Sequence, residues 1–104
     1  MVVNNESNKI MKRIKNIAET SYHGDSIEAS FFELASLFGL PNIKYEEKVN
    51  YCWELQTDEG IQFSIYDWKY YRPLLVEEPI TWHIGTDSEE HSKIIKQELD
   101  KLLY

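Results

Sequence analysis

Aromatic and charged residues crowd into one stretch of the sequence, "IYDWKYYRP" at residues 65–73, and "ITWHIG" follows at residues 80–85. Indole and phenol rings stack on planar bases, and Lys or Arg side chains neutralise a phosphate beside them. The two stretches therefore predict a binding site for a nucleotide-like ligand. The candidate residues of this site are Tyr66, Trp68, Lys69, Tyr71, Arg72, Trp82 and His83.

Catalysis is the weaker interpretation of the same region. Asp67 with His83 and Glu54 would supply acid–base groups for a small hydrolase or nuclease, and Cys52 with His83 would supply a nucleophile and a base. Neither set has a recognised catalytic spacing, and no Gly-rich phosphate loop, GxSxG elbow or HExxH is present. We therefore expect a protein that is not an enzyme and that needs no cofactor.

A metal site and disulfide bonds are also not expected. A zinc site needs three or four convergent ligands, whereas the histidines show no HxH or HxxxH spacing and no CxxC occurs. Cys52 is the single cysteine, so an internal disulfide is excluded, which fits a reducing cytoplasm.

The composition narrows the possible partners. The chain has 18 acids against 11 bases, a net charge of −7, whereas proteins that bind duplex nucleic acid usually present a basic face. No apolar run approaches the roughly 20 residues that cross a membrane, and the N-terminus lacks the features of a secretory signal. We expect a soluble cytoplasmic protein that binds neither membranes nor duplex nucleic acid.

The first part of the chain has a helical pattern. Apolar positions spaced by three and four predict a basic helix over residues 7–19. A second helix is predicted to begin at Asp25, with Glu28 completing a capping box, and to end at Gly39. The period then changes from about 3.6 to 2, which is typical of strands.

The second part of the chain predicts strands and a final helix. Residues 49–56 and 61–68 form a hairpin joined by "TDEG", residues 80–85 form a third strand, and Asp87 caps a helix that runs to the C-terminus. The predicted class is therefore α+β, a three-stranded antiparallel sheet with helices packed on one face, in the order ααβββα.

The length of the chain fits one domain, residues 1–104. Within it, residues 1–24 are expected to form a peripheral basic helix and residues 25–104 the α+β core. Strand alternation places the most apolar side chains under the helices. The opposite face then collects Cys52, Glu54, Ser64, Tyr66, Trp68 and His83. This face is a stacking platform, unless the first helix or a second subunit covers it and the rings form a core.

With these residues placed, the sequence resembles a group of small proteins from bacteriophage genomes. The likeness rests on "LASLFGLP", "VNYCWELQTDEG", "FSIYDWK" and "ITWHIG", and it covers about residues 34–98. This chain has Thr86 where the group has a second glycine. The resemblance implies a viral accessory protein that counteracts host defence by binding, in the cytoplasm of the host cell.

Two binding functions follow from the residues and the resemblance together. The first is a sponge that sequesters a nucleotide-like signal, as a homo-oligomer, because a chain of this size scarcely encloses a ligand. The alternative is a protein–protein inhibitor of a host defence enzyme, which would use exposed aromatic residues and an acidic surface. The acids of that surface are Glu46, Glu47, Glu77 and Glu78.

Overall fold

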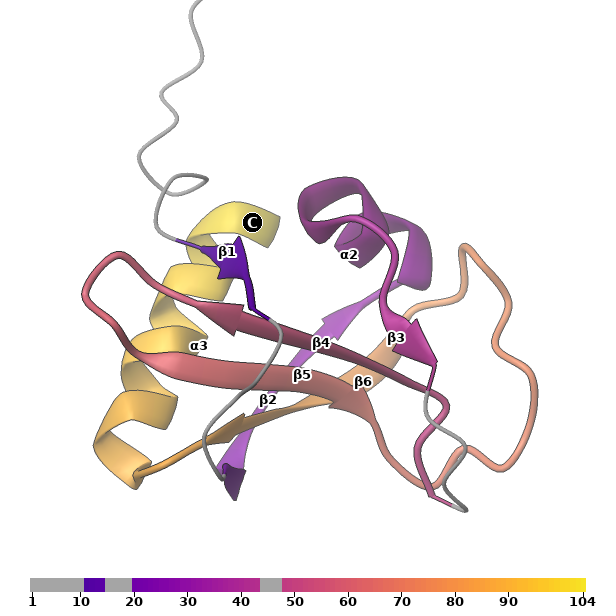
Figure 1. The fold of residues 1–104 in the computed structure, drawn as a ribbon. Helices are drawn as coiled ribbons and strands as arrows, with labels where there is room; N and C mark the ends of the chain where they lie inside the picture. Colours follow the sequence, from indigo (N-terminus) through magenta and orange to yellow (C-terminus); the bar gives the residue numbers. More distant parts are fainter. Residues whose placement is uncertain (1–10, 15–19, 44–47) are drawn as a thin grey trace, which may run out of the picture.

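The computed structural model describes residues 11–14, 20–43 and 48–104, which form one antiparallel sheet and two helices (Figure 1). Along the chain the elements are β1 (Lys12–Arg13), β2 (Ser21–Ala29), α2 (Phe31–Phe38), β3 (Asn42–Ile43), β4 (Tyr51–Gln56), β5 (Gln62–Asp67), β6 (Ile80–Thr86) and α3 (Glu89–Leu103). The strand order is β1-β4-β5-β6-β2, and the short strand β3 also pairs with β4. The α+β class is confirmed, whereas the predicted three-stranded sheet with the order ααβββα is wrong.

The predicted helix over residues 7–19 is not a helix where the structure describes it. Lys12–Arg13 form β1, which pairs with β4, and the backbone N–H of Ile14 donates to the carbonyl of Glu54 at 3.2 Å. The other positions of that helix lie outside the described residues, apart from Met11, which is buried in the core. The backbone groups at the edge of β4 need hydrogen-bond partners, and Lys12–Arg13 can supply them only as a strand. This pairing outweighs the local helical pattern.

Residues 25–29, predicted to open the second helix, belong to β2. This strand pairs with β6 and spans residues 21–29. It therefore crosses the predicted boundary between a peripheral helix (residues 1–24) and the core (residues 25–104), and that boundary is wrong. Ile27 and Ala29 alternate into the core, which is the period of a strand. Tertiary pairing with β6 has therefore overridden the local helical signal.

The helix α2 begins after Ser30, not at Asp25. The Ser30 hydroxyl accepts from the N–H of Glu33 at 3.0 Å, and the Glu33 carboxylate accepts from the N–H of Ser30 at 2.9 Å. Asp25 and Glu28 have the same spacing as this capping box, which explains the early start in the prediction. The predicted end of the helix at Gly39 is confirmed, and Gly39 has φ of +83°.

The second half of the chain folds as predicted, with small shifts. The hairpin of β4 and β5 turns at Gly60, whose φ of +93° suits a residue without Cβ. Trp53 pairs with Ile65 across this hairpin, on the apolar side. The N-cap of α3 is Ser88 rather than Asp87.

Both helices cover the same face of the sheet. Leu34 of α2 and Ile95 and Leu99 of α3 are fully buried, and α3 lies against β2 and β6 (Figure 1). The strands supply the rest of the core, chiefly Trp53, Leu55, Phe63, Ile65, Ile80, Trp82 and Ile84. In the described part of the chain, neither helix is long and apolar enough to cross a membrane.

Candidate functional site

The sheet face opposite the helices carries the polar and aromatic side chains. Side chains alternate along a strand, so residues in register on neighbouring strands lie side by side. Across β4, β5 and β6 the register aligns Cys52, Tyr66 and His83 in one row and Glu54, Ser64 and Gly85 in the next. We call this the open face.

Four rings meet on the open face. Tyr22 is parallel to His83, with centroids 3.9 Å apart and 14° between planes, and Trp68 stacks on His83 at 6.0 Å and 23°. Tyr66 meets Trp68 and His83 edge-on, at 6.1 and 5.6 Å. The prediction that Trp68 and His83 share a face is confirmed. The described helices do not seal this cluster, because Trp68 is 38% exposed and Tyr22 is 45% exposed.

Two lysine ammonium groups lie near the Trp68 indole. The Nζ atoms of Lys48 and Lys69 are 5.7 and 5.9 Å from its ring centroid, and the Lys69 N–H donates to the Lys48 carbonyl at 2.8 Å. Lys69 has φ of +62°, which is uncommon for a residue with Cβ and recurs at ligand sites. Two cations beside one exposed ring form a favourable place for an anion.

Asp67 holds the segment that carries Lys48. Its fully buried carboxylate accepts from the backbone N–H groups of Asn50 and Tyr51, at 2.9 and 2.8 Å, and from Asn50 Nδ2 at 2.8 Å. These bonds tie the chain before β4 to the end of β5, next to Trp68. Asp67 in "IYDWK" therefore positions the backbone.

The candidate catalytic sets are not brought together. Asp67 pairs with Trp82 on the core side of the sheet, whereas Glu54 and His83 lie on the open face in different rows. Cys52 is buried and lies in the same row as His83, with β5 between them. The strand register therefore separates the members of each candidate set.

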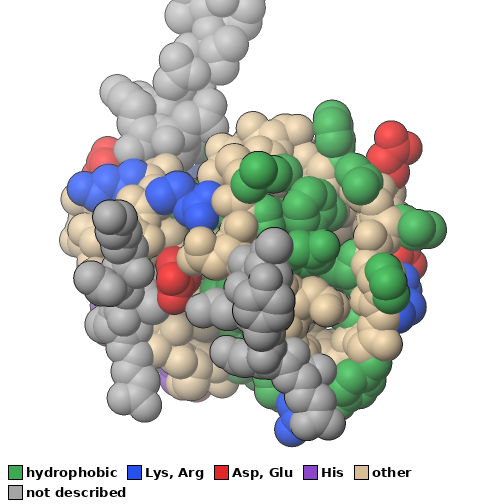
Figure 2. Space-filling view, turned by 45° about the vertical axis from the view of Figure 1, so that its right-hand side comes forward, with side chains coloured by type: hydrophobic (Ala, Val, Ile, Leu, Met, Phe, Trp, Pro, Cys, Tyr) green, Lys and Arg blue, Asp and Glu red, His purple; other side chains and the backbone are tan. Residues whose placement is uncertain are grey.

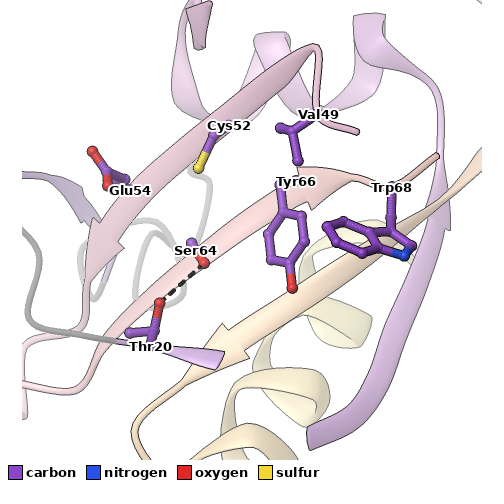
Figure 3. A pocket seen from close by; sticks show the side chains of 7 residues that line it. All are labelled: Thr20, Val49, Cys52, Glu54, Ser64, Tyr66 and Trp68. Carbon is purple, nitrogen blue, oxygen red and sulfur yellow. Dashed lines mark hydrogen bonds between the residues drawn. The ribbon is translucent and has the colours of Figure 1, made fainter. Parts of the chain in front are cut away.

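A pocket of about 300 Å³ opens on this face (Figure 3). Its lining residues are Thr20, Val49, Cys52, Glu54, Ser64, Tyr66 and Trp68. Figure 3 shows Tyr66 and Trp68 toward one end, Glu54 toward the other, and the hydroxyls of Thr20 and Ser64 between them, 3.4 Å apart. Small-molecule sites occupy roughly 300–1,000 Å³, so the pocket is at the lower limit.

Gly85 leaves room for the side chains around this pocket. A Cβ at this position would lie 2.6 Å from Ser64 Oγ, 3.3 Å from Thr20 Oγ1 and 3.4 Å from Tyr66 Cε1. The first distance is shorter than a real contact allows. The glycine of "WHIG" is therefore explained by close packing on the open face.

His83 and Tyr66 on the open face are neutral near pH 7. Burial lowers the pKa of His83 below its usual 6.5, because a partly desolvated imidazole resists charging. Burial also raises the pKa of the Tyr66 hydroxyl above 10.0, and neighbouring Cys52 and Tyr22 raise it further. The positive charge beside the rings therefore comes from the lysines and not from His83.

The structure brings together four of the predicted binding residues, Tyr66, Trp68, Lys69 and His83. The prediction for Trp82 is wrong. Its ring is fully buried on the helix side, and its Nε1–H donates to the Ala29 carbonyl at 2.8 Å. A residue at that place cannot touch a ligand on the open face.

Arg72 and Tyr71 do not join the ring cluster. The Arg72 guanidinium forms a two-bond ion pair with Glu78, at 2.9 and 2.7 Å, and lies over the Tyr70 ring. Tyr71 is exposed on the loop between β5 and β6, with φ of +48°, and has no ring contact with the cluster among the described residues.

Sequence reasoning missed Tyr22, Lys48 and Thr20. The stretch "SYHGD" is the first half of β2, where an irregularity between Tyr22 and Ser26 interrupts the pairing with β6. Tyr22 and Ser26 are four residues apart on β2, whereas their partners Gly85 and His83 are two apart on β6. The two extra residues leave Tyr22 and Ser26 on the same face of the sheet, so alternation along β2 places Tyr22 on the face that carries His83. Lys48 gave no signal, since its place depends on hydrogen bonds made by Asp67.

Among the described residues, no group of three or more His, Cys, Asp or Glu side chains is placed to hold a metal ion. The comparisons with known proteins supply no relative: no family model matches the chain, and no curated protein or solved structure matches it. The resemblance to small phage proteins therefore stays a prediction.

Proposed function

We propose that this protein is a non-enzymatic binding protein that captures a nucleotide-like ligand on the open face of its sheet. The observation that supports this most directly is the ring stack of Tyr22, His83 and Trp68 with Lys48 and Lys69 beside it. A planar base stacks on exposed π faces, and a phosphate meets two ammonium groups next to them. The neighbouring pocket adds hydroxyl groups that hydrogen-bond a base or sugar.

Binding without turnover is favoured by the surroundings of His83. Tyr22 and Trp68 stack against its ring, and no described carboxylate hydrogen-bonds to it. A general base needs an oriented imidazole within reach of the proton that it removes. The histidine is therefore better suited to stacking than to proton transfer.

The resemblance to phage accessory proteins implies that this binding counteracts a defence of the host cell. The ligand would then be a nucleotide immune signal, sequestered in the host-cell cytoplasm. A pocket of about 300 Å³ covers little of a cyclic dinucleotide, so a second subunit would complete the enclosure. This is the homo-oligomer that the sequence predicts.

Trp68 provides a reporter for ligand binding, because Trp53 and Trp82 are fully buried. We expect saturable quenching of tryptophan fluorescence with at least one member of a panel of AMP, GMP, cyclic dinucleotides and cyclic ADP-ribose isomers. Calorimetry on the double variant Lys48→Ala/Lys69→Ala should show binding that is weaker by at least about tenfold, as expected for two lost charge-assisted contacts. Lys101→Ala, on α3, is the matched control and should bind normally.

The same samples separate binding from hydrolysis. Ligand recovered intact after denaturation of the protein supports capture, whereas recovery of a cleaved product would assign an enzyme. Absence of binding across the panel, or full affinity in the double lysine variant, would overturn the proposed site.

Inhibition of a host enzyme through an acidic and aromatic surface is the alternative. Of its predicted acids, Glu46 and Glu47 lie outside the described residues, and Glu78 is paired with Arg72. A single stoichiometric host partner, with no nucleotide bound, would favour this alternative over capture of a ligand.

A further inference from the structure

Glu54 gives the pocket on the open face a negative end. Among the described residues that line this pocket, it is the only one with a charged side chain. Its Oε1 accepts from Asn42 Nδ2 at 3.3 Å, and no other described residue hydrogen-bonds or ion-pairs with the carboxylate. Because a carboxylate offers about four acceptor positions, most of its hydrogen-bonding capacity is left for a ligand.

The positive groups lie at the opposite end of the pocket. Lys48 and Lys69 are beside the Trp68 indole, and Figure 3 shows Trp68 and Glu54 at opposite ends. Glu54 pairs with Ser64, and Trp68 follows Ser64 by four residues; at about 3.3 Å per residue, the two ends lie about 13 Å apart along the sheet. A ligand that uses both ends is therefore an anion at one end and a hydrogen-bond donor at the other.

A nucleotide has two such ends, the phosphate and the hydrogen-bonding edge of the base. With the phosphate at Lys48 and Lys69, the base extends past Tyr66 into the pocket and turns its edge toward Glu54. The reverse orientation would place the phosphate against a carboxylate, and like charges repel. The pocket volume of about 300 Å³ is at the lower limit of small-molecule sites, so it suits one base rather than a whole dinucleotide.

The carboxylate of Glu54 selects among the bases by its lack of a donor. Guanine presents N1–H and the N2 amino group side by side, and two parallel donors match the two oxygens of a carboxylate. Adenine and cytosine present one amino group beside a ring nitrogen that accepts, so a lone pair would face the carboxylate. The hydroxyls of Thr20 and Ser64, between Glu54 and the rings (Figure 3), can donate to the O6 atom of guanine.

A free nucleotide fits this surface better than a nucleic-acid strand. Proteins that bind single strands combine stacking rings with a continuous basic groove. Figure 2 shows the Lys and Arg side chains of one side of the molecule in separate groups, with Asp and Glu side chains among them. The net charge of −7 is also unfavourable for a polymer of phosphates.

We propose that the open face selects guanine nucleotides, with Glu54 accepting from the N1–H and N2 amino groups of the base and with Lys48 and Lys69 holding the phosphate. This inference rests on the proposed capture of a nucleotide and names its base. It also gives Glu54 a role in binding, as an acceptor at the end of the pocket farthest from the lysines.

Calorimetry with matched nucleotides on the full-length protein tests the choice of base. GMP should bind at least about tenfold more tightly than AMP, as expected for hydrogen bonds to a charged acceptor. IMP keeps N1–H and O6 but lacks the N2 amino group, so its affinity should lie between the two. Cyclic di-GMP and cyclic di-AMP, compared in the same way, should show the same preference for guanine.

The variant Glu54→Gln assigns the preference to the carboxylate. It preserves the size of the side chain and the acceptor for Asn42, but it replaces one acceptor oxygen by an amide donor that can pair with adenine. The ratio of GMP to AMP affinity should fall by at least about fivefold. Glu59→Gln, in the exposed hairpin turn, removes the same charge outside the pocket and should preserve the ratio.

The lysine variant checks the orientation of the ligand. Lys48→Ala/Lys69→Ala should weaken GMP and AMP by the same factor, because both nucleotides carry the phosphate. A change in the ratio of their affinities in this variant would overturn the assignment of the two ends.

The outcomes separate this inference from the proposed function. Equal binding of GMP and AMP to the parent, or an unchanged ratio in Glu54→Gln, would overturn the selection of guanine and leave nucleotide capture in place. Absence of binding for every nucleotide would overturn capture itself, and the choice of base with it. If Glu54→Gln does not fold, as thermal unfolding would show, the order of GMP, IMP and AMP on the parent protein still decides the proposal.

Discussion

Replacing Asp67 by alanine should lower the free energy of unfolding by about 3–4 kcal/mol. The carboxylate accepts three hydrogen bonds, two from backbone N–H groups and one from Asn50 Nδ2. A buried donor left without its partner costs roughly 1–3 kcal/mol. The Asn50 amide is half-buried and can turn toward water, so most of the loss comes from the N–H groups of Asn50 and Tyr51, at about 1.5–2 kcal/mol each.

Urea denaturation followed by tryptophan fluorescence measures this loss. With a slope of about 1–2 kcal/mol per molar urea for a small domain, the midpoint should fall by about 2 M. Asp67→Asn should lose only about 1–2 kcal/mol, because its Oδ1 can still accept both backbone bonds while the Asn50 amide turns around. Glu59→Ala, which removes an exposed carboxylate from the hairpin turn, should leave the midpoint unchanged.

The same variants connect stability to the site. Lys48 precedes the tethered segment, so Asp67→Ala, which loses both backbone bonds, should bind nucleotide more weakly than the parent, whereas Asp67→Asn, which keeps them, should bind like the parent. A loss below about 1 kcal/mol in Asp67→Ala would refute the reasoning, because it would mean that water replaces the carboxylate at no cost. Equal losses in Asp67→Ala and Asp67→Asn would refute the geometry that we assign to Oδ1.

Three further predictions concern the open face and the helix start. The pKa of His83 is lowered in the folded protein, so the unfolded chain binds more protons below about pH 6.5. The parent should therefore lose stability relative to His83→Gln as the pH falls from about 7.5 to 5.5. Paired urea titrations of the two proteins measure this difference. Gly85→Ala should cost about 1–2 kcal/mol through its contact with Ser64 Oγ, and the added change Ser64→Ala should recover part of this cost in a double-mutant cycle. Ser30→Ala should lower stability by about 1 kcal/mol, measured by thermal unfolding, because Glu33 loses its reciprocal cap.

The elements that the sequence predicted well are those with an unambiguous local pattern. In the hairpin of β4 and β5, Trp53 and Leu55 alternate with polar residues, and Gly60 marks the turn. In α3, Ile95 and Leu99 recur at helical spacing after a Ser and Asp pair that can cap. Such patterns leave one low-energy conformation, so neighbours in the sequence are sufficient to identify it.

The elements that failed were decided by partners distant in sequence. Residues 25–29 have a helical start signal, yet Ile27 faces Trp82 in the sheet, and burial against β6 outweighs a capping preference of about 1 kcal/mol. Lys12–Arg13 are likewise a strand because β4 has an edge to be paired. Short segments with mixed signals adopt whatever the sheet requires.

The sequence by itself determined which side chains of β4, β5 and β6 share a face, because alternation along a strand is a local property of the backbone. It could therefore place Trp68 with His83 before any fold was known. Only the tertiary structure decided what surrounds them. Tyr22 lies on β2, which pairs with β6, and it stacks on His83. The buried Asp67 carboxylate fixes the segment that follows Lys48, and Arg72 forms an ion pair with Glu78. The contacts of Tyr22 with His83 and of Asp67 with Asn50 and Tyr51 join residues distant in the chain, and their formation depends on the pairing and packing of the whole sheet rather than on any local pattern.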